Sequence, residues 1–172
     1  MINKIYTTYF ANKSILDDRY QVVNIATSAP VWFSGHYIHF EECKPHTHTV
    51  GVWYRSMKDE YAKRDYIYEY YKTTLSKLSP EEWEEILSSL IKEIHQNVGY
   101  DKIAVLSCYE KPQTFCHRLV FSVFIKLILG LEISELGFPD IFKCEEALFI
   151  ENILTTILTN DNYGKYNKNK ES

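Results

Sequence analysis

The most constraining feature of the sequence is the segment 101–108, a continuous apolar run that lies between two segments with helical character. A strand without polar alternation is typical of the centre of a parallel sheet, where both faces are buried. The segment before it opens with Ser-Pro-Glu-Glu at 79–82, a capping box, and then repeats apolar residues every three or four positions. The segment after it, 116–129, is apolar almost all round and predicts a well-buried helix. This order of helix, strand and helix predicts an α/β fold.

The remaining elements extend the same alternation along the chain. β-Branched, aromatic or alternating residues predict further strands, at 4–10, 20–26 and 131–136. Apolar residues at helical spacing predict further helices, at 58–78 and 143–159. Together these segments predict a single three-layer, Rossmann-like domain with a mainly parallel sheet.

Three segments fall outside this pattern. Residues 27–30 end the second strand as a loop, and residues 31–57 have no helical period, so we expect irregular or short-strand structure there. Residues 160–172 are rich in Asn, Lys and Gly, which predicts a flexible C-terminal tail. The single α/β domain is therefore expected to span residues 1–159.

Length and charge exclude several classes of protein. The chain has 172 residues, a usual length for one domain, and its net charge of −4 argues against a broad nucleic-acid or anionic-membrane surface. The N-terminus lacks the apolar stretch of a signal peptide, and the longest apolar run, 119–131, is shorter than a membrane span. We therefore expect a cytoplasmic protein whose 4 cysteines are thiols, ligands or core residues rather than disulfides. The sequence does not indicate an oligomeric state.

Residues with reactive side chains follow the apolar strand. In open α/β sheets ligands bind beyond the carboxyl ends of the strands, which is where Cys108, Tyr109 and Glu110 are expected. The next helix opens with Cys116 and His117, and a helix N-terminus lowers a thiol pKa and attracts anions. Glu110, Cys116 and His117 are therefore the predicted catalytic residues, as acid/base, nucleophile and proton carrier.

A second set of residues is expected to bind the ligand. Arg118 follows His117 and has the guanidinium geometry that anchors a phosphate or carboxylate. Tyr9, Thr27 and Ser28 come at or after the ends of the first two predicted strands. The predicted ligand-binding residues, which share this expected position at one edge of the sheet, are Cys108, Tyr109, Arg118, Tyr9, Thr27 and Ser28.

Each of these side chains also has a structural explanation. Cys108 and Cys116 are small residues that often pack in a core. Glu110 is placed to cap the following helix or to pair with Lys111 or Arg118. His117 is equally compatible with a buried, hydrogen-bonded imidazole. The clustering of all of them on one strand–loop–helix unit is what favours a site.

The same segment resembles the domain of unknown function 488 family. The family pattern is a hydrophobic strand ending in Cys-x-Glu, a short loop, and Cys-His-Arg at the start of a helix. Residues 108–112 read Cys-Tyr-Glu-Lys-Pro and residues 115–118 read Phe-Cys-His-Arg. Residues 5–12 are similar to the opening strand of the family, and residues 70–72 lie where the family often has a Tyr-rich helix.

The resemblance implies an α/β fold and a site built from Cys108, Glu110, Cys116, His117 and Arg118. It implies no particular reaction. The chain departs from the family at 25–30, which holds no Arg where family members tend to carry one. If that Arg binds substrate, this chain has lost or changed an activity.

Two other clusters allow different interpretations. The segment 36–48 holds four His and a Cys, and Cys43, His46 and His48 could ligate zinc, although their spacing matches no common zinc motif. Loop histidines are usually solvated, so the prediction requires no cofactor and keeps zinc as the alternative. The tyrosines between 61 and 71 are expected in the core and at its rim, with stacking on a nucleobase as the alternative.

Three functions compete at this stage. The first is an enzyme, a hydrolase or transferase that acts on a phosphate-bearing or nucleotide-like small molecule at residues 108–118. The second is a non-catalytic protein that binds or sequesters a nucleotide-derived ligand. The Lys-, Asn-, Ile- and Tyr-rich composition suggests an AT-rich genome, and a phage origin would give such a binder a host-takeover or anti-defence role. The third is a metal-dependent protein that uses residues 36–48, with Cys116 and His117 as further candidate ligands.

Overall fold

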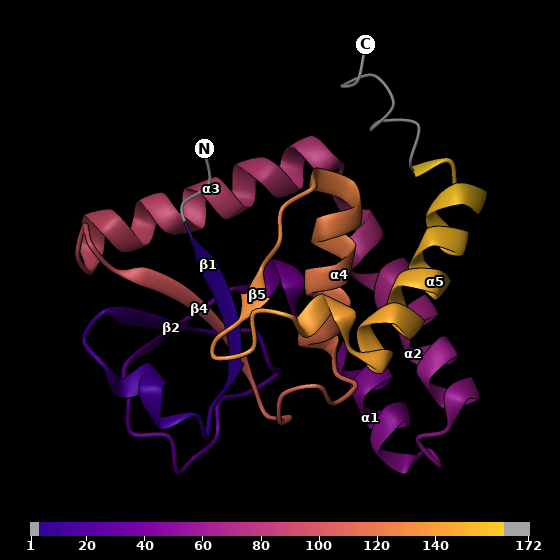
Figure 1. The fold of residues 1–172 in the computed structure, drawn as a ribbon, viewed down its shortest axis with the longest axis horizontal. Coiled ribbons are helices and arrows are strands. Elements are labelled where there is room, and N and C mark those ends of the chain that lie inside the picture. The colour runs from indigo at the N-terminus through magenta and orange to yellow at the C-terminus, as the bar shows by residue number, and fades with distance from the viewer. Residues whose placement is uncertain (1–3, 164–172) are drawn as a thin grey trace.

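The computed structural model describes residues 4–163, which form five helices around a five-stranded sheet (Figure 1). Every pair of neighbouring strands is parallel, and the strand order is β3-β2-β4-β1-β5. The strands are β1 (Ile5–Tyr9), β2 (Tyr20–Asn24), β3 (Tyr37–His39), β4 (Ile103–Cys108) and β5 (Ser134–Glu135). The prediction of a single α/β domain with a parallel sheet is confirmed.

Strand β4 lies at the centre of the sheet, as its apolar sequence predicts. Five of its six residues pair with β1 on one side, and five pair with β2 on the other. Five of its six residues are buried, because helices and loops cover both of its faces. The carboxyl ends of β1, β4 and β5 therefore meet at one edge, where the residues that follow β4 project.

Five α-helices pack around this sheet. They are α1 (Thr47–Arg55), α2 (Glu60–Thr73), α3 (Pro80–Asn97), α4 (His117–Leu129) and α5 (Glu145–Asn160). Figure 1 shows α1, α2, α4 and α5 gathered on one side of the strands, with α3 along the top of the view. The connection from β1 to β2 contains only a short 3-10 helix, η1 (Lys13–Leu16), which packs beside β2. No helix among the described residues is long and apolar enough to cross a membrane.

An aromatic cluster holds α3 against α4. Trp83 of α3 is fully buried, its ring lies edge-on to Phe121 and Phe124 of α4, and its Nε1–H donates to the Leu75 carbonyl at 3.0 Å. The predicted capping box is present, with Ser79 Oγ accepting from the Glu82 N–H. These contacts fix the orientation of α4, the helix that carries the candidate site at its N-terminus.

Helix α1 corrects one prediction, because residues 31–57 were expected to be irregular or short-strand. The segment contains β3 and also a regular helix, Thr47–Arg55. Its Thr, Val and Gly residues are poor helix formers, which hides the helix from the sequence pattern. Packing supplies the missing stability, since Trp53 contacts the rings of Tyr66 and Phe115.

Several predicted boundaries shift. The strand expected at 131–136 is reduced to the two residues of β5, and the helix expected at 58–78 divides into α2 and a 3-10 turn, η3 (Leu75–Lys77). The predicted tail starts inside the described chain, where Tyr163 packs edge-on against Tyr71. Residues 164–172 of that tail lie outside the described residues.

Candidate functional site

Two cysteines and a glutamate meet at the carboxyl edge of the sheet. Cys108 is the last residue of β4 and Cys116 is the N-cap of α4, and the loop between them carries Glu110. The two sulfur atoms and a carboxylate oxygen of Glu110 all lie within 4.8 Å of one another. The Cys108 thiol donates to Glu110 Oε2 at 3.1 Å. The sequence prediction that these three side chains share one site is consistent with this geometry.

The two thiols have opposite acidities. Burial raises the pKa of Cys108 well above its usual range, and the adjacent Cys116 thiol raises it further. Burial also acts to raise the pKa of Cys116, but the adjacent Cys108 thiol and the charge of Arg118 outweigh it, so the pKa lies below its ordinary value. Cys116 is therefore the thiol that ionises first, as is typical of a cysteine at a helix N-terminus.

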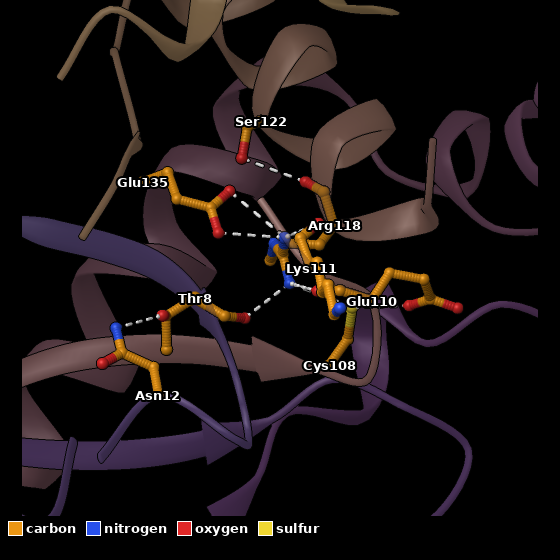
Figure 2. A network of polar contacts seen from close by, with 8 residues as sticks. All are labelled: Thr8, Asn12, Cys108, Glu110, Lys111, Arg118, Ser122 and Glu135. Atoms are coloured by element: carbon orange, nitrogen blue, oxygen red, sulfur yellow. Dashed lines mark hydrogen bonds and ion pairs between the residues drawn. The ribbon is translucent and has the colours of Figure 1, made fainter. Parts of the chain in front are cut away.

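Arg118 lies beneath this cluster and is almost completely buried, at 1% exposure. Its Nη1 donates to the carbonyl of Thr8 at 2.7 Å, to the carbonyl of Glu110 at 3.0 Å and to Cys108 Sγ at 3.4 Å (Figure 2). Its Nη2 forms an ion pair with Glu135 at 3.0 Å and donates to the Lys111 carbonyl at 3.4 Å. The guanidinium therefore ties together the ends of β1, β4 and β5.

These contacts change what Arg118 can do. Sequence reasoning expected it to anchor a phosphate or carboxylate of the ligand. The structure instead directs the guanidinium to the protein's own carbonyls and to Glu135, and it does not line the neighbouring cavity. Its positive charge still acts on the site, because it lowers the pKa of the adjacent Cys116. Arg118 is thus a positioning and charge-balancing residue.

Glu135 is the residue that sequence reasoning missed. It belongs to the predicted alternating strand at 131–136, in which residues 131, 133 and 135 lie on the same face, and the structure buries Ile133 and Glu135 on that face. A carboxylate on the buried face of a strand must be paired with a cation. The alternation was therefore the available signal, although the sequence alone did not identify Arg118 as the partner.

His117 connects α4 to the loop after β2. Its Nε2 lies 2.9 Å from the Ile25 carbonyl, which assigns the proton to Nε2. Burial lowers the pKa of His117 to about 4, so the imidazole is neutral at physiological pH. Its ring also packs edge-on against Tyr70. The histidine therefore positions the first turn of α4, and its proton on Nε2 is held by a backbone carbonyl rather than being free for transfer.

A small cavity of about 50 Å³ opens above the cluster. The predicted site residues that line it are Thr27, Tyr109, Glu110, Cys116 and His117. Its remaining wall is largely aromatic and comes from α1, α2 and the loop after β4, with Trp53, Tyr54, Tyr66 and Phe115. A cavity of this size accepts one small group or the reacting end of a larger ligand.

A second cavity of about 290 Å³ lies between α1 and α2. It shares Trp53 and Tyr66 with the small cavity, so these two rings stand between the two spaces. Asp65 and Glu69 also line it.

The other predicted ligand residues are dispersed. Tyr9 is half-buried at the end of β1, opposite Cys108 in the strand register. Thr27 and Ser28 are exposed, and only Thr27 lines the small cavity. Of the six predicted ligand-binding residues, Tyr109 and Thr27 therefore face this cavity directly, while Cys108 lies below it.

The second predicted cluster, Cys43, His46 and His48, is not assembled into a metal site. Cys43 is fully buried, its thiol donates to the Phe40 carbonyl at 3.7 Å, and burial raises its pKa well above the usual range. His46 and His48 are exposed, and His46 caps α1 by accepting from the His48 N–H. Within residues 4–163, the one group of three side chains close enough to share a metal ion is Cys108, Glu110 and Cys116.

Comparisons with protein-family models, with curated proteins and with solved structures found no match to this chain. The resemblance to the domain of unknown function 488 family therefore stays a prediction that depends on its motif residues.

Proposed function

We propose that the protein is a hydrolase or transferase that acts on a nucleotide-like small molecule, with Cys116 as nucleophile and Glu110 as acid/base. One observation carries this proposal. A thiol with a lowered pKa, a carboxylate and the N-terminus of α4 converge on one cavity at the carboxyl edge of a parallel sheet.

The proposed reaction has two half-reactions. Glu110 accepts the proton of Cys116, the thiolate attacks an electrophilic carbon of the substrate, and the leaving group departs with the proton that Glu110 holds. Water or a second acceptor then gives a proton to Glu110 and attacks the thioester or thioether carbon, and the S–C bond breaks. The released Cys116 thiolate takes that proton back from Glu110, which restores the starting thiol and carboxylate, so atoms and charge balance over the cycle.

The walls of the cavity favour a flat substrate. Aromatic side chains from three elements border it, and such rings stack on nucleobases and other planar groups. Within the described part of the chain no Lys or Arg lines the cavity, because Arg118 is directed inward. A phosphate on the substrate would therefore have to meet the backbone N–H groups at the start of α4.

The test is mass spectrometry of a nucleotide and nucleoside mixture incubated with the protein, analysed before and after denaturation. A compound of changed mass, formed by wild-type protein and by Cys144→Ser but not by Cys116→Ser or Glu110→Gln, would support the proposal. Cys144 is a matched control because it is a free thiol in the N-cap of α5, outside the cavity. Turnover that survives in both site variants would refute the assigned roles.

A second function, ligand sequestration at the same cavity, is favoured by one feature of the site. The Nε2 proton of His117, one of the predicted catalytic residues, is held by the Ile25 carbonyl at 2.9 Å, which leaves it no role in proton transfer to a ligand. A binder predicts that one compound is depleted from the mixture and recovered unchanged on denaturation. Recovery of an altered compound would exclude it.

A further inference from the structure

We propose that Cys108, Glu110 and Cys116 form a binding site for a thiophilic divalent cation such as Zn²⁺, with its open coordination position facing the small cavity. Thiolate sulfur and carboxylate oxygen are ligands that Zn²⁺ prefers, and three protein ligands with a free fourth position are typical of a zinc site that is open to small molecules. This inference does not depend on the proposed reaction.

The spacing of the ligand atoms fits a tetrahedral ion. Zinc–sulfur bonds of about 2.3 Å and zinc–oxygen bonds of about 2.0–2.2 Å place tetrahedral ligand atoms roughly 3.5–3.8 Å apart. Cys108 Sγ lies 3.1 Å from Glu110 Oε2, and all three ligand atoms lie within 4.8 Å of one another. Small side-chain rotations therefore suffice to bring the three atoms into coordination distance.

The scaffold holds two of the ligands rigidly. Cys108 ends the central strand, and Cys116 is the N-cap of a helix that is buried along most of its length. Glu110 is partly exposed at the mouth of the site, so it has the freedom to close on an ion. A rigid pair with one adjustable ligand provides a route of entry for the metal.

The chemical character of the cluster also favours a bound cation. Two thiols and a carboxylate are packed together, with their three ligand atoms within 4.8 Å of one another. A bound dication would let both thiols ionise. Arg118 does not replace that ion, because Glu135 already pairs with it at 3.0 Å. Its Nη1, 3.4 Å from Cys108 Sγ, is instead placed to donate to a metal-bound thiolate and to orient it.

Metal binding has a direct consequence for Cys116. The sulfur lone pair that coordinates an ion is not available to attack a substrate, and the same holds for Glu110 as a base. The metal-bound state and the free-thiolate state are therefore mutually exclusive. A zinc ion at this position would inhibit the reaction proposed above.

The experiment is a Co²⁺ titration of the reduced full-length protein, followed by competition with Zn²⁺. Thiolate ligands give Co²⁺ an intense sulfur-to-metal charge-transfer absorption, and binding of one ion per chain with this band is expected. Cys108→Ser and Cys116→Ser should weaken binding by more than roughly tenfold and reduce the band, since even partners that only orient a ligand contribute about 10–100-fold. The matched controls Cys43→Ser and Cys144→Ser should retain both.

Glu110→Gln provides a variant whose folding is not in question, because Glu110 is partly exposed in a loop. It should weaken Co²⁺ binding and leave the charge-transfer band in place, because both sulfurs remain. Absence of a charge-transfer band in folded wild-type protein, or an unchanged affinity in folded Cys108→Ser and Cys116→Ser, would overturn the proposal. Catalysis is not measured in this experiment, so a negative result here leaves the proposed function to its own test.

Discussion

Breaking the buried pair between Arg118 and Glu135 should strongly destabilise the fold. Both side chains are 1% exposed, and their charged atoms approach to 3.0 Å. Burial raises the pKa of Glu135 although Arg118 acts to lower it, which shows that removing the carboxylate from water opposes much of the attraction. The pair is therefore expected to add little net stability, while loss of one partner leaves an uncompensated buried charge.

The magnitudes follow from what each substitution leaves behind. Glu135→Gln keeps the shape and leaves Arg118 without its counter-charge, which should lower the free energy of unfolding by about 3–5 kcal/mol. Arg118→Met leaves Glu135 unpaired and also removes the donor to the buried Thr8 carbonyl, a further loss of about 1–3 kcal/mol. Because domains are stable by about 5–15 kcal/mol, Arg118→Met should be at the limit of folding.

Urea unfolding followed by tryptophan fluorescence measures these changes, and the single variant Glu135→Met with the double variant Arg118→Met/Glu135→Met completes a double-mutant cycle with Arg118→Met. We expect the double variant to be more stable than the sum of the single losses by about 3 kcal/mol, since no charge stays unpaired. Glu132→Gln is the matched control, because Glu132 forms an exposed ion pair with Lys126 at 3.1 Å and should change stability by less than about 1 kcal/mol. A Glu135→Gln variant as stable as this control would refute the reasoning.

Three other perturbations test separate parts of the structure. The pKa of His117 falls from 6.5 to about 4 on folding, so the unfolded chain binds this proton more tightly. The free energy of unfolding should therefore fall by about 3 kcal/mol as the pH drops from 6.5 to 4. Urea unfolding at a series of pH values measures this fall, and His117→Gln should remove most of it. Ser79→Ala removes the capping box of α3 and should lower the free energy of unfolding by about 1 kcal/mol, seen as a lower Tm in calorimetry. Gly130 ends α4 with a φ of 68°, and a Cβ added there would meet no neighbouring atom. Gly130→Ala should therefore lower the free energy of unfolding by about 1 kcal/mol through backbone strain alone, and Gly130→Asn should lower it by less. Equal effects of the two variants in urea unfolding would contradict this cause.

The parts of the fold that sequence could predict are those where a local pattern determines the environment. The apolar run of β4 can only be buried on both faces, and the capping box with its apolar stripe can only begin an amphipathic helix. Cys108, Glu110 and Cys116 could be placed together because a strand, a short loop and a helix leave the chain few ways to separate them.

The parts that sequence could not predict depend on distant contacts. Helix α1 forms from weak helix formers because Trp53 packs against rings on α2 and on the loop before α4. The role of Arg118 depends on Glu135, 17 residues away, and on a carbonyl of β1, 110 residues away. Without these partners, Arg118 at a helix start has the same sequence signature as a phosphate anchor.

Arg118 also links the stability of the fold to the chemistry of the site. The same guanidinium that joins the ends of three strands lowers the pKa of Cys116 and lies 3.4 Å from Cys108 Sγ. A loss of activity or metal binding in an Arg118 variant would therefore not distinguish a role in chemistry from a loose sheet edge. Glu135→Gln makes that distinction, because it loosens the guanidinium without removing its charge. If Glu135→Gln lowers stability while the Cys116 thiol keeps its reactivity and its pH dependence, the charge of Arg118 acts on the thiol directly. If both change together, the site depends on the strand ends being held in register.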